Sequence, residues 1–252
     1  MLSISPTKYD ELASLWHQRL RHLNFAALWS ILGCKTPLAA SICETCVKTK
    51  HRRRFTRKSV PRSTSPFETT HSDLCGPFSC SSFSEAQDFI LYIDDYTCFC
   101  WVYFLRTQEA NEVTSLFHEF RERIRKIFPK WEISSFWCDN AKGEFTNIFF
   151  QDILSATGIQ FHPAPPYSQH TNGVSERMIQ TILCKARALL LDACLPAALC
   201  IETVNTALYL HSLSPSRSID NKSPYEMLYR TKPCLDPLRR FGCVAYKWIL
   251  KA

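Results

Sequence analysis

The sequence predicts an α/β fold, in which a mixed five-stranded sheet with flanking helices follows a small helical unit. Two observations lead to this prediction. Short apolar runs and longer amphipathic segments follow one another in the order βββαβαβα, which is typical of α/β layers. A histidine pair and a cysteine pair lie ahead of this region, inside a segment too short to bury a core of its own.

The composition is that of a globular protein with one or two domains. The chain has 252 residues, of which 46% are hydrophobic and 21% are charged, so it can bury a core. No apolar run is long enough for a transmembrane helix and the N-terminal segment has no signal peptide, so we expect no membrane association. The thirteen cysteines are expected to be reduced thiols, with clustered ones as candidate metal ligands.

Apolar periodicity places the elements in order. Apolar residues recur at three-to-four spacing in the segments expected to be helical and concentrate in short runs in those expected to be strands. The expected elements are a helix over 9–33, strands over 67–75, 89–93 and 99–105, a helix over 113–128, a strand over 133–137, a short helix near 149–154, a strand over 159–162, and helices over about 175–191 and 197–212.

A basic segment divides the chain. Eight basic residues and no acid lie between Lys48 and Arg62, and subtracting them from the net charge of +7 leaves −1 for the rest. Such a run cannot enter a core without desolvating its charges. We therefore expect a small unit over 1–47, a solvated linker over 48–62, a core over 63–215 and an extension over 216–252. The linker is either a plain connector or a contact for nucleic-acid phosphates or nuclear import.

The histidine and cysteine pairs predict a zinc site. His17 and His22 are spaced H-x4-H, and Cys43 and Cys46 are spaced C-x2-C, which fits a closed tetrahedral site. On one straight helix the two histidines would point apart, so at least one must lie at a helix end or turn. The alternative is two surface histidines and two core cysteines. The metal interpretation is favoured because so small a unit needs a metal for stability.

Three acids are candidates for a second metal site. Asp73 lies on the first expected strand, Asp139 ends a later strand and Glu176 begins a helix. Carboxylates converging at one sheet edge can hold two Mg²⁺ ions for phosphoryl transfer. Each acid alone would be read as a solvated strand-end or helix-end residue. Asp94 and Asp95 are assigned to a tight turn instead.

Several segments together resemble the integrase of copia-type LTR retrotransposons, over nearly the whole chain. The resemblance rests on LWHQRLRHLN at 15–24, CETC at 43–46, DNAKGEF at 139–145, PYSQHTNGVSER at 166–177, SPYEML at 223–228 and LRRFGC at 238–243. Asp73, Asp139 and Glu176 match the D, D, E acids of that family in order. Arg21 stands where the family usually has Gly.

The resemblance implies an RNase H-like core and a polynucleotidyl transferase and endonuclease activity within an element polyprotein. That activity comprises DNA 3′-end processing and strand transfer, with Mg²⁺ or Mn²⁺ at the three acids and Zn²⁺ in the N-terminal unit. The expected partners are element-end DNA and target DNA, with RNA as a further nucleic acid, and a second copy of the chain. The expected location is the nucleus, after assembly in cytoplasmic particles. The residues expected to contact nucleic acid are Arg52, Arg53, Arg54, Arg57, Lys58, Gln169, Asn172, Arg177 and Lys185.

Two other functions compete with this one. The first is an inactive retrotransposon remnant that only binds nucleic acid, against which the intact acid triad argues. The second is an RNase H-like nuclease without strand transfer. The zinc unit and the NGVSER segment at 172–177 argue against the nuclease.

Overall fold

The structure is a computed structural model that describes residues 6–32, 43–49, 62–78, 85–139, 145, 147–163 and 173–246. Helices surround one sheet within these residues. The helices are α1 (Pro6–Arg19), α2 (Phe25–Leu32), α3 (Glu44–Thr49), α4 (Ala110–Ile127), α5 (Ile148–Thr157), α6 (Gly173–Ala193), α7 (Cys200–Ser212) and α8 (Pro224–Tyr229), with 3-10 turns at Ala197–Leu199 and Arg217–Ile219. The strands are β1 (Thr69–Cys75), β2 (Asp88–Asp94), β3 (Cys100–Leu105), β4 (Ser135–Cys138) and β5 (Gln160–Pro163).

The sheet is mixed and has five strands in the order β3-β2-β1-β4-β5. β1, β2 and β3 form an antiparallel meander, whereas β4 pairs parallel to β1 and β5 pairs parallel to β4. The parallel pairings require crossovers, which α4 and α5 provide. The predicted five-stranded α/β sheet is therefore confirmed, and β1 lies at its centre.

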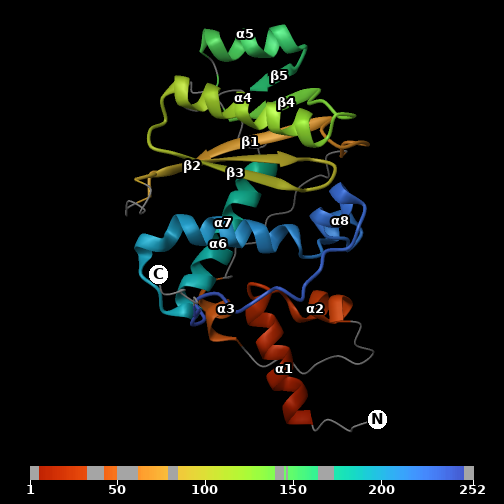
Figure 1. Cartoon of the computed structure of the whole chain (residues 1–252), viewed down its shortest axis with the longest axis vertical. Coiled ribbons are helices and arrows are strands. Elements are labelled where there is room, and N and C mark those ends of the chain that lie inside the picture. Colours follow the sequence, from red (N-terminus) through yellow and green to blue (C-terminus); the bar gives the residue numbers. More distant parts are fainter. Residues whose placement is uncertain are drawn as a thin grey trace, which may run out of the picture.

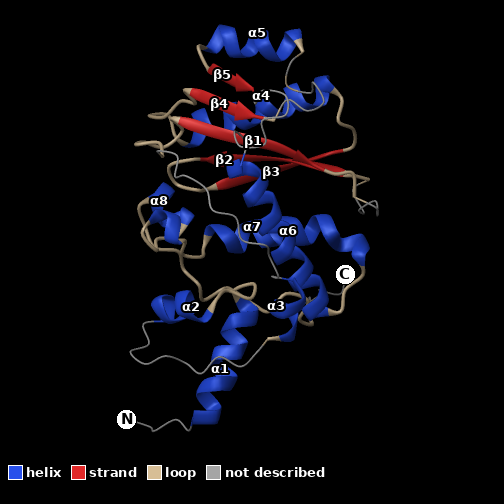
Figure 2. Cartoon of the chain, turned by 180° about the vertical axis from the view of Figure 1, so that it is seen from behind, coloured by secondary structure: helices blue, strands red, loops and turns tan. Residues whose placement is uncertain are grey.

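Alternating side chains give the sheet two apolar faces. Ile90 and Tyr92 of β2 pack in a cluster with residues of α4, whereas Leu91 packs in a second cluster with Ile179 and Ile182 of α6. Helix α4 lies across one face in Figure 1, and Figure 2 shows the sheet from the other side. In both views α6 and α7 lie between the sheet and the N-terminal helices, so α6 connects the two regions.

The N-terminal region differs from the single helix predicted over 9–33. It forms α1 and α2, which are separated by residues 20–24. Arg21 and His22 both have positive φ, at 52° and 57°, so α1 cannot continue through them. The side chain of Asn24 then accepts a hydrogen bond from the backbone N–H of Ala27 at 2.9 Å, which caps the start of α2.

The N-terminal helices share the core of the sheet. Leu20, Leu23 and Leu28 are buried in the same apolar cluster as Ile182 of α6 and Leu210 of α7. The N-terminal unit is too small to bury a core of its own, and its apolar side chains are instead covered by the larger region. The boundary drawn between 1–47 and the core stays a prediction about folding units.

Packing also extends past the other predicted boundaries. Lys48 lies within α3, where it pairs with Glu44 at 2.6 Å, so the predicted linker begins inside a helix. Arg62 is exposed, and its guanidinium also donates hydrogen bonds to the backbone oxygens of Asp95 and Ser218. The remaining linker residues lie outside the described residues. Leu228 of the predicted extension is buried in the α4-side cluster, so α8 packs against the core. Within the described ranges, no helix has the length and apolarity needed to cross a membrane.

Candidate active site and metal centre

Asp73 lies on β1, and Asp139 directly follows β4, the parallel strand beside β1. The register of β1 and β4 pairs His71 with Trp137 and Ser72 with Cys138, and its next step sets Asp73 opposite Asp139, which directly follows β4. On its other side Asp73 pairs with Leu91 of β2, whose side chain belongs to the α6-side cluster. Both half-buried carboxylates therefore lie on the α6 face, at the same end of the sheet.

Glu176 lies in the first turn of α6. Gly173 and Ser175 are buried beside it, and α6 packs against β1 and β2. The half-buried Glu176 thus stands at the helix end where unpaired backbone N–H groups favour a carboxylate. The sheet and α6 thus place three acids that are widely separated in the sequence on the same face of the molecule.

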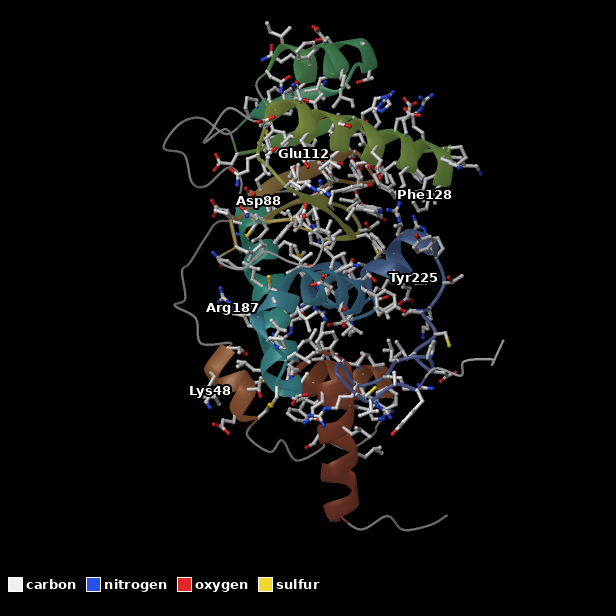
Figure 3. All side chains as sticks on the ribbon, turned by 60° about the vertical axis from the view of Figure 1, so that its left-hand side comes forward. Lys48, Asp88, Glu112, Phe128, Arg187 and Tyr225 are labelled. Carbon is white, nitrogen blue, oxygen red and sulfur yellow. The ribbon has the colours of Figure 1, made fainter. Side chains whose placement is uncertain are left out.

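The surroundings of Asp73 are negative. Burial raises the pKa of the Cys75 thiol to about 11, and the charges of Asp73 and Asp88 raise it further, while Arg187 opposes them. Asp88 was not among the sequence candidates. It is buried, and its Oδ1 accepts a hydrogen bond from Gln108 Nε2 at 2.6 Å. Figure 3 shows Asp88 on the same side of the molecule as Arg187.

Gly76 allows the close approach between Asp88 and the end of β1. Its φ is +146°, and a Cβ there would lie 2.0 Å from Asp88 Oδ1. No side chain fits in that space. The chain leaving β1 after Asp73 is therefore packed directly against Asp88. Asp73 and Asp139 offer carboxylate oxygens at this end of the sheet, the hard ligands that Mg²⁺ prefers. Among the described residues, however, the acids do not form a close cluster of metal-ligand atoms, and only His17, His22, Cys43 and Cys46 do so.

The predicted zinc ligands come together on the N-terminal helices. One ligand atom from each of His17, His22, Cys43 and Cys46 lies within 4.8 Å of the other three. His17 Nε2 is 3.2 Å from His22 Nδ1 and 3.2 Å from Cys46 Sγ, and His22 Nδ1 is 3.3 Å from Cys43 Sγ. Tetrahedral Zn²⁺ would set such atoms about 3.3–3.8 Å apart. The two nitrogens and two sulfurs therefore fit Zn²⁺.

The end of α1 explains how two histidines five positions apart can meet. The backbone N–H of His22 bonds to the carbonyl of His17 at 2.6 Å, and that of Arg21 bonds to Gln18 at 3.2 Å. This is the Schellman pattern, with Arg21 in the left-handed position that glycine usually fills. The turn brings His22 back over His17, as the H-x4-H spacing required.

A backbone contact orients His17 for metal binding. Its Nδ1 lies 2.7 Å from the carbonyl oxygen of Leu23. Because a carbonyl only accepts, Nδ1 carries the proton and Nε2 keeps its lone pair toward the cluster. The ring of Phe25 stacks on the imidazole at 4.7 Å between ring centroids, which holds the ring in that orientation.

Comparisons with known proteins relate the whole chain to polyproteins of plant transposons. No protein-family model matches the chain. The "Retrovirus-related Pol polyprotein from transposon TNT 1-94" of Nicotiana tabacum is 30% identical over 248 residues, which cover 96% of this chain and 18% of that protein. The corresponding polyprotein from transposon RE1 of Arabidopsis thaliana is 28% identical, over 94% of this chain and 16% of its own length.

The chain is a relative of the copia-type retrotransposon Pol polyproteins. It spans under a fifth of the length of the curated relatives it matches. The resemblance found in its motifs is thereby confirmed along nearly all of the sequence.

A solved structure shows the same fold. A chain of the structure "CryoEM structure of simian T-cell lymphotropic virus intasome in complex with PP2A regulatory subunit B56 gamma" superimposes with a TM-score of 0.56 at 17% identity. The match covers 97% of this Pol-polyprotein relative and 81% of that chain. The likeness extends over the N-terminal helices and the sheet together, and it confirms the expected fold class.

The expected nucleic-acid contacts of this copia-type relative divide into three groups. Arg177 is exposed beside Glu176, as a phosphate contact requires. Nζ of the half-buried Lys185 lies 3.1 Å from Nδ1 of the buried His211, so this side chain reaches toward α7. Its expected contact with nucleic acid stays a prediction. The other expected contacts lie outside the described residues: Arg52, Arg53, Arg54, Arg57, Lys58, Gln169 and Asn172.

Asp94 and Asp95 occupy the turn after β2. Asp94 is buried and accepts hydrogen bonds from the backbone N–H groups of Phe67 and Thr97, at 2.7 and 2.9 Å. Burial raises its pKa, against those hydrogen bonds. Asp95 Oδ1 lies 3.6 Å from His71 Nε2. Burial disfavours its charge, but the contacts to His71 and Ser63 outweigh burial and lower its pKa. Both acids have structural partners at the opposite end of β2 from Asp88.

Proposed function

We propose that this chain is a retrotransposon integrase that carries out metal-dependent DNA 3′-end processing and strand transfer within an element polyprotein. One observation carries the proposal. Asp73 on β1 and Asp139 at the end of the adjacent parallel strand β4 lie on the face where α6 presents Glu176. The relatedness to Pol polyproteins supports the same function.

The protein's own part in this chemistry is to hold charge and position DNA. Asp73, Asp139 and Glu176 would hold Mg²⁺ or Mn²⁺, which activates an attacking oxygen and stabilises the leaving one. Because water and a DNA 3′-hydroxyl are the nucleophiles, no residue needs to form a covalent intermediate. The exposed Arg177 follows Glu176 directly, where its guanidinium can bind a phosphate of the bound strand.

The zinc cluster has a structural part in this proposal. His17, His22, Cys43 and Cys46 would fill all four positions of tetrahedral Zn²⁺, leaving no open position for a reacting water. Bound Zn²⁺ would hold the turn after α1 and α3 together against α6, which α3 contacts. Zinc would thus stabilise the region that supports the helix carrying Glu176.

The proposed partners are element-end DNA, target DNA and a second copy of the chain. The basic run between Lys48 and Arg62 supports nucleic-acid binding, because it concentrates positive charge that exceeds the net charge of the whole chain. Joining two DNA molecules requires access to chromosomes, so we place the activity in the nucleus.

A strand-transfer assay tests the proposed function. The protein, loaded with Zn²⁺, is incubated with labelled duplexes that carry the element's terminal-repeat ends, target DNA and Mg²⁺ or Mn²⁺. We expect joined products from the wild type and a loss of at least about a hundredfold in Asp139→Asn, which removes a charged group at nearly constant shape. Asp152→Asn, at an exposed acid of α5, is the matched control.

The competing functions predict different results in this assay. A binding-only remnant would bind the duplexes and give no product in any metal. A plain nuclease would cut without joining. Full activity of Asp139→Asn in Mg²⁺ would overturn the proposed mechanism.

A further inference from the structure

Three aromatic side chains form a row beside the acid pair. The register sets His71 of β1 beside Trp137 of β4, and Trp137 beside His162 of β5. The rings of Trp137 and His162 stack with centroids 4.6 Å apart and planes inclined by 23°. His71 is tilted at 44° to Trp137, with centroids 6.3 Å apart, and it contacts Asp95. The row therefore begins at His71 and ends at His162, and its stacked part is the Trp137–His162 pair.

The row lies on the same face as the acids. Phe136 and Cys138, the neighbours of Trp137, are buried in the α4-side cluster, so Trp137 points to the opposite face. Asp139 is two residues beyond Trp137, and Asp73 is two residues beyond His71. Two residues of strand span about 7 Å. The aromatic row and the acid pair are thus successive rows of one surface.

The outer end of this stack is not covered by a described helix. On this face α6 packs against β1 and β2, and α7 packs against β3. Helix α5 contacts β5 from the other face, through Phe150 against Phe161. Trp137 and His162 are accordingly only half-buried. β5 is the last strand of the sheet in the part of the chain that the structure describes, where no further strand lies beside His162.

We propose that the Trp137–His162 stack binds an unpaired nucleobase of the DNA strand whose phosphodiester lies at Asp73 and Asp139. The inference rests on the proposed function, which sets DNA at the acids. Aromatic and imidazole rings stack on bases of any sequence. The 7 Å between the rows corresponds to about two nucleotide steps of 3.4 Å along a strand. A base within two nucleotides of the reacting phosphate can therefore extend the stack beyond His162.

The occupant is a base rather than an aliphatic side chain because of what borders the stack. An imidazole stands at each end of the row, and the adjoining row consists of carboxylates. Such a surface is polar at its rim and flat in its stacked part. A planar heterocycle with polar edges matches both properties.

Binding measurements without added Mg²⁺ test this inference separately from catalysis. The probe is a fluorescently labelled duplex with an unpaired three-nucleotide 3′ overhang, compared with the same duplex carrying an abasic overhang. We expect the wild type to bind the first about fivefold or more tightly than the second. His162→Ala should lose this preference, and His162→Phe should keep it. His118→Ala, an exposed histidine of α4, is the matched control.

Two results would overturn the inference. One is equal wild-type affinity for the two overhangs, and the other is an unchanged preference in His162→Ala. Weakening of both probes by the same factor in His162→Ala also counts against stacking, because it shows a backbone contact or a folding defect. Quenching of tryptophan fluorescence by the overhang should disappear in Trp137→Phe and remain in Trp131→Phe, whose ring packs in the α4-side cluster.

Two variants distinguish a failure of the proposed function from a failure of the stacking inference. Asp139→Asn should lose strand transfer while keeping the preference for a base in the overhang. If Asp139→Asn stays active, the proposed function fails while the stack is still measured by binding. If His162→Ala keeps its base preference while Asp139→Asn is inactive, the stack alone fails.

Discussion

Arg21 Nε donates a hydrogen bond to Ser214 Oγ at 3.3 Å, joining positions 193 residues apart. Arg21 is 1% exposed and lies between the two histidines of the metal cluster. Ser214 follows α7, and its hydroxyl in turn donates to the carbonyl of Leu210 at 2.6 Å. The turn that contains Arg21 and positions His22 in the zinc cluster is therefore packed against the end of α7, in the helical layer below the sheet.

Loss of zinc should therefore destabilise the whole chain. We expect Cys46→Ser to lower the free energy of unfolding by about 4 kcal/mol or more, in one cooperative transition that includes the sheet. Calorimetry with Zn²⁺ present measures this change. Cys194→Ser, at an exposed cysteine of the described chain, should be nearly neutral. A separate early transition confined to the N-terminal helices would contradict the expectation.

His211 should make stability depend on pH. Burial, followed by the charges of Lys185 and Arg21, holds its pKa well below the ordinary value of 6.5. The folded state keeps this imidazole neutral while the unfolded chain protonates it, so stability should fall as the pH drops below about 6.5. The slope attributable to this group approaches about 1.4 kcal/mol per pH unit. Denaturant unfolding of His211→Gln and of the wild type, both in Zn²⁺ at each pH, isolates the contribution of His211 to the pH dependence of stability.

Neutralising an acid of the candidate metal site should change the free energy of unfolding much less than removing an acid of the turn. Asp94→Ala leaves the buried N–H groups of Phe67 and Thr97 without their acceptor, and we expect it to cost about 3 kcal/mol. Asp139→Asn removes one of several neighbouring negative charges and should leave stability within about 1 kcal/mol of wild type. Chemical denaturation measures both. A large loss in Asp139→Asn would assign that acid a structural role.

Gly76 should tolerate no side chain. In Gly76→Ala the new Cβ meets Asp88 Oδ1 at 2.0 Å, at a φ of +146°, so the end of β1 must shift. We expect a loss of about 3 kcal/mol or more and weaker strand transfer. Gly158→Ala is the control, since its φ is +69° and nothing lies within 4 Å. That variant should cost only about 1 kcal/mol.

Local patterns predicted the elements well where periodicity alone decides them. The strand expected over 89–93 is Asp88–Asp94, and the helix expected over 113–128 is Ala110–Ile127. Periodicity failed between Leu20 and Leu28, because apolar spacing continues across the break. The signal there was Asn24, a capping residue ahead of an apolar run.

Long-range features were less accessible to sequence reasoning. That β1 lies beside β4 follows from pairing between distant segments, and no local pattern encodes it. The positions of Asp73, Asp139 and Glu176 on strands and at a helix start suggested that they could converge, and the resemblance to a family favoured that interpretation over solvated acids. A buried Arg21 ran against expectation, because arginine is seldom fully buried. The sequence also did not indicate the contact of the half-buried Lys185 with the buried His211.

The two candidate metal sites differ in when they can form during synthesis. The zinc cluster draws its ligands from a short stretch, since His17 and Cys46 are 29 positions apart, so it can close while most of the sheet is still untranslated. The acid site needs the parallel pairing of β1 with β4 and then α6. Non-local pairing of this kind is slow. The ribosome therefore releases the N-terminal helices first, and the proposed metal site can form only after Glu176 has left the exit tunnel.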